Sequence, residues 1–241
     1  MPSLDRSATV ARIVTEHPAA AQVFQKHGID YCCRGDVTVP VACLDGRLDP
    51  VALFAELEAA IAAGAALPEE DATSLSTAAL VARIVDRHHA YLRRALPYIA
   101  PIAAKVAAVH GAREARLEEL HATFRELANS LAPHLVEEEE VLFPLLMART
   151  PDIRLAQEEL RGMEHDHLAV GDLLARIRAL TDGFTTPAWG CNTYRVLMSE
   201  LDALEADILR HVHLENHVLA PRFRAAAASA TSRGAPAEAR P

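Results

Sequence analysis

Two histidine–glutamate pairs recur at the same spacing. His134 and Glu138 lie four residues apart in HLVEEEEVLFP, and His211 and Glu215 lie four apart in HVHLENHV. A helix places positions i and i+4 on one face, and leucines flank both pairs on that face. A carboxylate directed into a core is costly unless a cation pairs with it. Two such pairs on separate helices therefore indicate a metal site.

Two further helical segments offer histidines to the same site. One contains His88 and His89, and the other contains His165 and His167. Periodicity leaves the choice open within each pair. On the second of these segments, His167 lines up with Leu160 and Leu174, whereas His165 lines up with Leu168.

The donor set defines the kind of metal site. Imidazole and carboxylate are ligands for iron, manganese or zinc, and the absence of cysteine from these segments argues against a thiolate zinc site. Four histidines and two glutamates exceed the needs of one tetrahedral ion. They suit two ions about 3.5–4 Å apart, bridged by carboxylates. The other acids of the EEEE run, which are Glu137, Glu139 and Glu140, are expected on a solvated face.

Four long helical segments must position these residues. They are predicted at about 77–109, 112–149, 151–180 and from 186 or 192 to 224. Short connections favour antiparallel neighbours, hence an all-α, up-down-up-down four-helix bundle over residues 76–224.

The bundle is preceded by a small helical unit, predicted over residues 1–64. Two short helices joined at His17 and Pro18 end at Gly28, and another helix runs from Asp49 to about Ala63. Residues 65–75 are predicted to be a linker, and 225–241 a disordered tail, from their Gly, Pro and polar content.

The composition of the 241-residue chain excludes several classes of protein. Ala and Leu dominate the 51% hydrophobic content, which favours helices, and the net charge of −9 argues against a nucleic-acid binder. Neither a signal peptide nor a membrane-spanning run is recognisable. Four cysteines do not suggest a secreted disulfide framework. A cytoplasmic protein is expected.

Two parts of this sequence resemble known protein families. The segments HHAYLRRALP, HLVEEEEVLFP, MEHDHLAVGDLL and HVHLENHVLAPR are similar to the four metal-bearing helices of hemerythrin-like domains. The front segment VARIVTEHPAAAQVFQKHGIDYCCRG resembles the N-terminal domain of the iron–sulfur cluster repair family (RIC, ScdA or YtfE). Together the matches cover most of residues 5–224.

The resemblance implies a centre of two non-haem irons, bridged by carboxylates and an oxo group. Its predicted ligands are His89, His134, Glu138, His165, His211 and Glu215. It therefore selects His89 over His88 and His165 over His167. Glu164 matches the family as a residue of the access or proton route. Ser130 stands where the family often has an acid, which weakens a proton-relay role there.

The resemblance also implies a function. Such proteins restore iron–sulfur clusters damaged by oxidative or nitrosative stress, so damaged iron–sulfur proteins and nitric oxide or oxygen species are the expected partners. Iron donation and a nitric oxide reductase-type activity both remain open, as does a homodimer. The alternatives are an oxygen or nitric oxide sensor without turnover, a zinc or manganese hydrolase, and a metal-free bundle.

Cys32 and Cys33 are adjacent, so only a strained disulfide could join them. Packing in a half-buried loop is one interpretation. The family pattern favours a redox or docking role instead, and the sequence does not show whether this loop approaches the bundle.

Overall fold

The computed structural model describes residues 4–64 and 71–224, so the predicted tail and most of the predicted linker lie outside the described residues. Within those two ranges the chain is helical, and its β pairing is a single isolated bridge between Thr9 and Thr38. The prediction of an all-α fold is confirmed.

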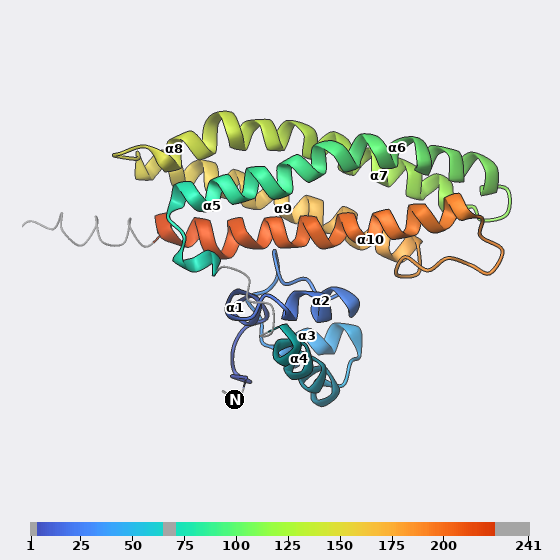
Figure 1. Cartoon of the computed structure of the whole chain (residues 1–241), viewed down its shortest axis with the longest axis horizontal. Coiled ribbons are helices and arrows are strands. Elements are labelled where there is room, and N and C mark those ends of the chain that lie inside the picture. Colours follow the sequence, from blue (N-terminus) through green and yellow to red (C-terminus); the bar gives the residue numbers. More distant parts are fainter. Residues whose placement is uncertain (1–3, 65–70, 225–241) are drawn as a thin grey trace, which may run out of the picture.

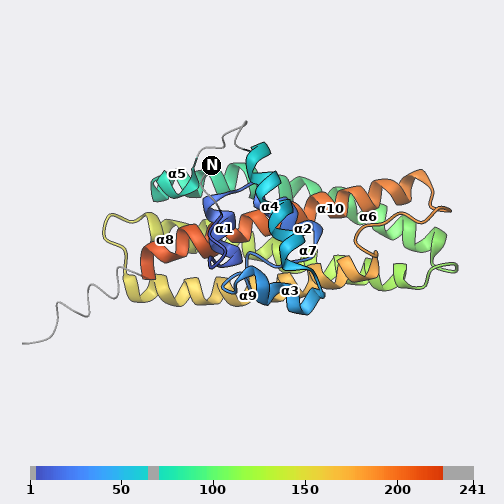
Figure 2. The ribbon, with the colours of Figure 1, turned by 90° about the horizontal axis from the view of Figure 1, so that it is seen from below.

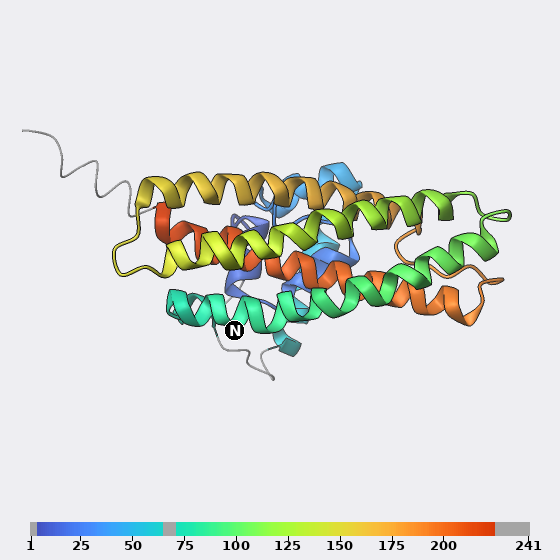
Figure 3. The ribbon, with the colours of Figure 1, turned by 90° about the horizontal axis from the view of Figure 1, so that it is seen from above.

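Four long helical rods form an antiparallel bundle (Figures 1 and 3). The first rod comprises α5 (Thr77–Arg83), η2 (Ile84–His89) and α6 (Ala90–His110), and the second comprises α7 (Arg116–Glu137), η3 (Glu138–Leu142) and α8 (Phe143–Met147). The third is α9 (Ile153–Leu180), and the fourth is α10 (Asn192–His213) with η4 (Leu214–Leu219). Helix α6 packs on α7 and α10, and α7 packs on α9. The fourth rod therefore starts at Asn192, the later of its two predicted starts.

Three of the rods contain a π-helical turn, and the sequence analysis predicted none of them. These turns are η2, η3 and η4. A π turn inserts one residue into an α-helix and is frequent at functional sites. It rotates everything beyond it by about 100°, so one helical period cannot describe the whole rod.

The N-terminal unit consists of α1 (Val10–Glu16), α2 (Ala20–Lys26), α3 (Val39–Gly46) and α4 (Pro50–Gly64). Thr9 caps α1 by accepting from the N–H of Arg12, and Gly28 has the positive φ (65°) that suits a glycine beyond a helix end. Helix α3 was not predicted. The unit lies beside α9 and α10 (Figures 1 and 2).

The hydrophobic core falls into two parts. The larger part joins the N-terminal unit to most of the bundle, and the smaller part fills the bundle end formed by α5, α8, η4 and the start of α9. Each rod passes from one part to the other at a polar residue. Glu138, for example, lies between Leu135 of the larger part and Leu142 of the smaller part. A buried polar layer therefore divides the core.

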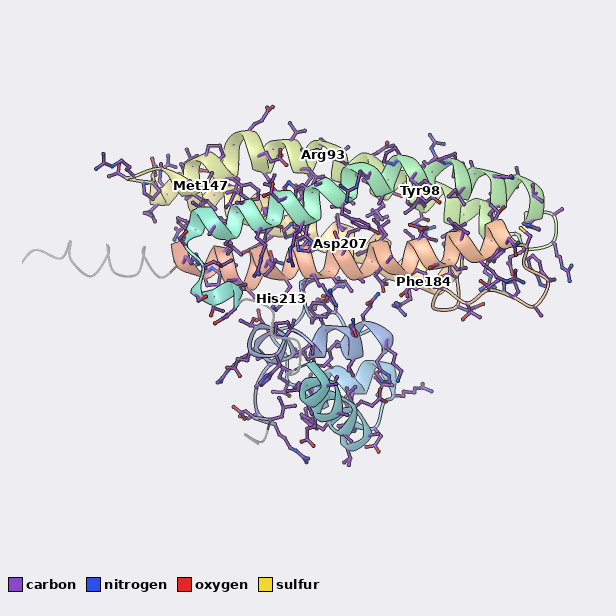
Figure 4. The ribbon with its side chains drawn as sticks, in the orientation of Figure 1. Arg93, Tyr98, Met147, Phe184, Asp207 and His213 are labelled. Carbon is purple, nitrogen blue, oxygen red and sulfur yellow. The ribbon has the colours of Figure 1, made fainter. Side chains whose placement is uncertain are left out.

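Polar contacts also join the N-terminal unit to the bundle. Buried His213 lies on the side of α10 that faces the unit (Figure 4), with its Nε2 3.1 Å from the hydroxyl of Thr15. Buried Glu205 accepts from Arg178 Nε of α9 at 2.8 Å and from Gln25 Nε2 of α2 at 3.2 Å. Glu205 thus connects three elements.

In the part of the chain that the structure describes, every helix is too short or too polar to cross a membrane.

Replacing Glu205 by alanine should lower the free energy of unfolding by about 3 kcal/mol, because Arg178 is left half-buried without its counter-charge. Urea unfolding monitored by circular dichroism measures this. The matched control is Glu119→Ala, which breaks an exposed pair with Arg176 (side chains 47% and 55% exposed). It should cost about 1 kcal/mol or less. Equal losses in the two variants would contradict this role of Glu205.

Candidate metal centre

Six side chains make up the polar layer of the bundle. All are buried, with exposed fractions from 0% to 6%, so solvent does not stabilise their charges. They come from all four rods: His89, His134, Glu138, His167, His211 and Glu215.

The six side chains form two groups that share a carboxylate. His89, Glu138, His211 and Glu215 offer donor atoms within 4.8 Å of one another, and so do His134, Glu138 and His167. In each group two imidazole Nε2 atoms face each other at 3.1 Å. Two nitrogens that bind one ion at about 2.1 Å lie about 3 Å apart, so the spacing suits shared ligation.

Each carboxylate reaches both groups. Glu138 places Oε1 3.2 Å from His134 Nε2 and Oε2 3.4 Å from His89 Nε2. Glu215 places Oε1 2.9 Å from His211 Nε2 and Oε2 3.3 Å from His167 Nε2. One oxygen per group is the arrangement of a bridging carboxylate.

Most of the carboxylate oxygens lack an ordinary hydrogen-bond partner among the described residues. Both oxygens of Glu138 and Oε2 of Glu215 are buried there without a hydrogen bond of acceptable geometry. Unpaired buried carboxylate oxygens are strongly destabilising unless a cation neutralises them. The donors present therefore fit a cation, and their nitrogen and oxygen mixture suits iron, manganese or zinc.

The pKa values of the histidines and glutamates in the layer also indicate that positive charge is favoured there. Burial would lower the pKa of His134, but the carboxylates of Glu138 and Glu215 outweigh it and raise that pKa to about 9. Burial would raise the pKa of Glu215, but the imidazoles of His211 and His167 hold it well below its ordinary value. The layer therefore favours ionised carboxylates and balances them with protons, which a metal ion would displace.

Outer partners orient several of the imidazoles. Glu139 accepts from His89 Nδ1 at 2.6 Å and from Arg93 at 2.8 Å. Glu139, whose side chain is 27% exposed, is therefore more than the solvated residue that was expected, because it also contacts a candidate ligand. His167 Nδ1 lies 2.9 Å from Asn216 Oδ1. Such contacts fix the ring tautomer and leave Nε2 free to bind metal.

The structure places one predicted ligand apart from the two groups. His165 is exposed on α9 and belongs to neither group, whereas His167 is 1% exposed and lies in the second group. Two residues along a helix differ by about 200° in direction, so only one of them can face the core. The other five predicted ligands do come together, with His89 inside the first group and its neighbour His88 outside it.

The predicted access residue, Glu164, also lies apart from the two groups. It forms an ion pair with Arg224. Asp166, directly before His167, is the acid of α9 that approaches a candidate ligand, with Oδ2 3.5 Å from His134 Nδ1. Its side chain is 48% exposed, so it connects this ligand to solvent.

The Cys32–Cys33 turn does approach the bundle. Both thiols are free, with their sulfurs 3.3 Å apart. Cys33 Sγ donates to the backbone carbonyl of His167 at 3.3 Å. The turn therefore lies directly behind a candidate ligand.

Comparisons with known proteins agree with both parts of this structure. The Hemerythrin HHE cation binding domain matches residues 80–223, and the N-terminal ScdA domain, described as a Domain of Unknown function (DUF542), matches residues 6–61.

Relatives match over almost the whole chain. The iron-sulfur cluster repair protein ScdA of Staphylococcus haemolyticus is 31% identical, over 91% of this chain and 99% of that protein. The iron-sulfur cluster repair protein YtfE of Musicola paradisiaca is 32% identical, over 90% and 96%. A probable iron-sulfur cluster repair protein of Haemophilus influenzae is 30% identical, over 88% and 95%. The chain therefore belongs to the hemerythrin HHE cation-binding family and, over almost its full length, to the family of iron–sulfur cluster repair proteins.

Proposed function

We propose that this protein repairs iron–sulfur clusters damaged by oxidative or nitrosative stress, using two iron ions held in the polar layer of the bundle. The observation that supports this most is the pair of carboxylates, Glu138 and Glu215, each of which offers one oxygen to each of two histidine pairs. The relatives named as iron–sulfur cluster repair proteins support the choice of cluster repair as the process in which this site acts.

The proposed ligand set divides evenly between the two ions. His89 and His211 would hold one ion, His134 and His167 the other, and the two glutamates would bridge them. Bound iron would supply one-electron redox chemistry and positions open to a diatomic molecule. Histidine and carboxylate hold iron less tightly than thiolates do, which is compatible with donation of iron to a damaged cluster.

The surroundings of the layer suit its proposed reactants. A mainly apolar groove of about 250 Å³ between α6 and α7 is lined by Leu92, Leu96 and Leu135, close in sequence to His89 and His134. Nitric oxide and oxygen are small and weakly polar, so they are compatible with an apolar groove of this kind. Half-exposed Asp166 beside His134 Nδ1 offers a separate polar route for protons.

The proposal includes the cytoplasm as the compartment in which the protein acts. All four cysteines are free thiols, which is typical of proteins in a reducing compartment and favours the cytoplasm. The predicted homodimer remains a prediction.

The site assignment predicts different metal contents for two neighbouring variants. Wild-type protein should bind about two irons per chain. His167→Ala should bind about one or fewer, because one pair keeps a single imidazole, whereas His165→Ala should bind as much as wild type. Elemental analysis of anaerobically purified protein measures this. Loss of iron in His165→Ala but not in His167→Ala would show that His165 is the ligand, as the family motif implied.

The repair function predicts recovery of a damaged enzyme. Iron-loaded protein should restore activity to an aconitase-type enzyme whose cluster was destroyed by nitric oxide or peroxide. It should do so with consumption of nitric oxide, with release of iron, or with both. Glu138→Ala should leave the enzyme at the level of the protein-free control. Reversible binding of nitric oxide, with neither recovery nor consumption, would instead support a sensor or carrier.

A further inference from the structure

The Cys32–Cys33 turn of the N-terminal unit is tightly folded and closely packed on the bundle. Asp30 Oδ1 accepts the backbone N–H groups of Cys32 and Cys33 at 3.0 and 2.9 Å, which fixes the turn. Cys32 is 2% exposed, so its backbone carbonyl needs partners inside the protein. These partners come from η4, the π turn that also contains Glu215.

The carbonyl of Cys32 accepts two hydrogen bonds from η4. Asn216 Nδ2 donates at 2.9 Å, and His217 Nε2 lies at 2.9 Å from the same oxygen. Asn216 is 8% exposed, and its other amide atom, Oδ1, lies 2.9 Å from Nδ1 of His167. One amide therefore connects the backbone of the N-terminal unit to a candidate metal ligand.

The donor and acceptor roles along this chain follow from chemistry. A carbonyl can only accept, so the NH₂ group of Asn216 must face Cys32 and its oxygen must face His167. That oxygen can also only accept, so His167 must carry its proton on Nδ1. Its Nε2 lone pair is then directed at Glu215 and His134, 3.3 and 3.1 Å away. The Cys32 carbonyl thus determines the tautomer in which His167 binds metal.

The turn also contacts the backbone of the same ligand, through the Cys33 thiol and the His167 carbonyl at 3.3 Å. The other candidate imidazoles are held differently. His89 is oriented by Glu139, which lies within the bundle. His211 Nδ1 is buried and has no hydrogen-bond partner among the described residues. His167 is therefore the ligand whose orientation comes from the N-terminal unit through a neutral amide.

We propose that Asn216 is a positioning residue that couples the Cys32–Cys33 turn to His167, so that the turn and the metal centre stabilise each other. The proposal rests on the metal centre proposed above. Closing of the turn holds His167 in its binding tautomer, and metal bound to His167 holds Asn216 and hence the turn. Linkage requires these two effects to be equal in size. Accessibility of the turn thiols therefore reports on the metal centre.

The test compares iron affinity with thiol reactivity in Asn216→Leu, a variant of similar size without either hydrogen bond. Iron affinity, from competition with a chelator, should fall by about 10- to 100-fold, the usual effect of losing an outer partner of a metal ligand. The second measurement is the alkylation rate of each cysteine with iodoacetamide, resolved by peptide mass spectrometry with and without iron. In wild type, iron should slow alkylation of Cys32 and Cys33. In Asn216→Leu, iron should have no such effect.

Three controls sharpen the test. Exposed Cys191, at the far end of the bundle, should react equally in every sample. Asn216→Asp keeps an acceptor for His167 but loses the donor to Cys32, so it should recover part of the iron affinity while the thiols remain unprotected. Gln25→Leu removes a different contact between the N-terminal unit and α10. It should preserve the effect of iron on the turn.

The outcomes separate this inference from the proposed function. Failure of wild type to bind iron would overturn the proposed function, and the inference with it. Iron binding in wild type with unchanged affinity and unchanged thiol protection in Asn216→Leu would overturn the inference alone. Equal loss of coupling in Gln25→Leu and Asn216→Leu would also overturn it, because general loosening of the N-terminal unit would then explain both.

Discussion

Two carboxylates buried among four imidazoles are the feature on which the rest of this structure depends. Glu138 and Glu215 have exposed fractions of 2% and 0%, and three of their four oxygens lack a hydrogen bond within the described part of the chain. Charges in this position destabilise a fold unless cations neutralise them. The layer also interrupts the hydrophobic core, which continues on both sides of it. Such an arrangement is understandable if metal binding contributes to folding free energy.

The surrounding elements are arranged to hold this layer. Three π turns place His89, Glu138 and Glu215, and the long unbroken helix α9 places His167. Outer partners then fix the rings, from within the bundle for His89 and from the N-terminal unit for His167. The small N-terminal unit shares the larger part of the core with the bundle. Its stability and the geometry of the site are therefore connected.

Much of this was predictable from the sequence because helical spacing is local. The i, i+4 pairs His134–Glu138 and His211–Glu215 indicated two inward faces, and the four rods followed from their apolar stripes. Periodicity left both histidines of α9 open, since His167 lined up with Leu160 and Leu174 and His165 lined up with Leu168. Matching to the family motif selected His165, and only the structure shows that Leu160 and Leu174 are buried whereas Leu168 is 39% exposed. When a motif is matched to one helix at a time, the match does not take into account which side of that helix faces the core.

Other features depend on contacts that spacing does not reveal. The π turns have no clear residue signature, so the choice between His88 and His89 could not be made from a single helical period. Glu139 belongs to a run of four acids, and only the position of His89 on another rod distinguishes it. The link from Cys32 to His167 joins residues more than a hundred positions apart through Asn216, which the sequence analysis did not consider.

The most direct test of the proposed di-iron centre is the metal content of anaerobically purified wild-type protein and of Glu138→Ala, measured together with their melting temperatures. A di-iron centre implies about two irons per wild-type chain. It predicts that Glu138→Ala loses iron and melts at a lower temperature, because a bridging ligand is gone. Stoichiometric zinc or no metal in wild type, with Glu138→Ala melting at the same or a higher temperature, would contradict it.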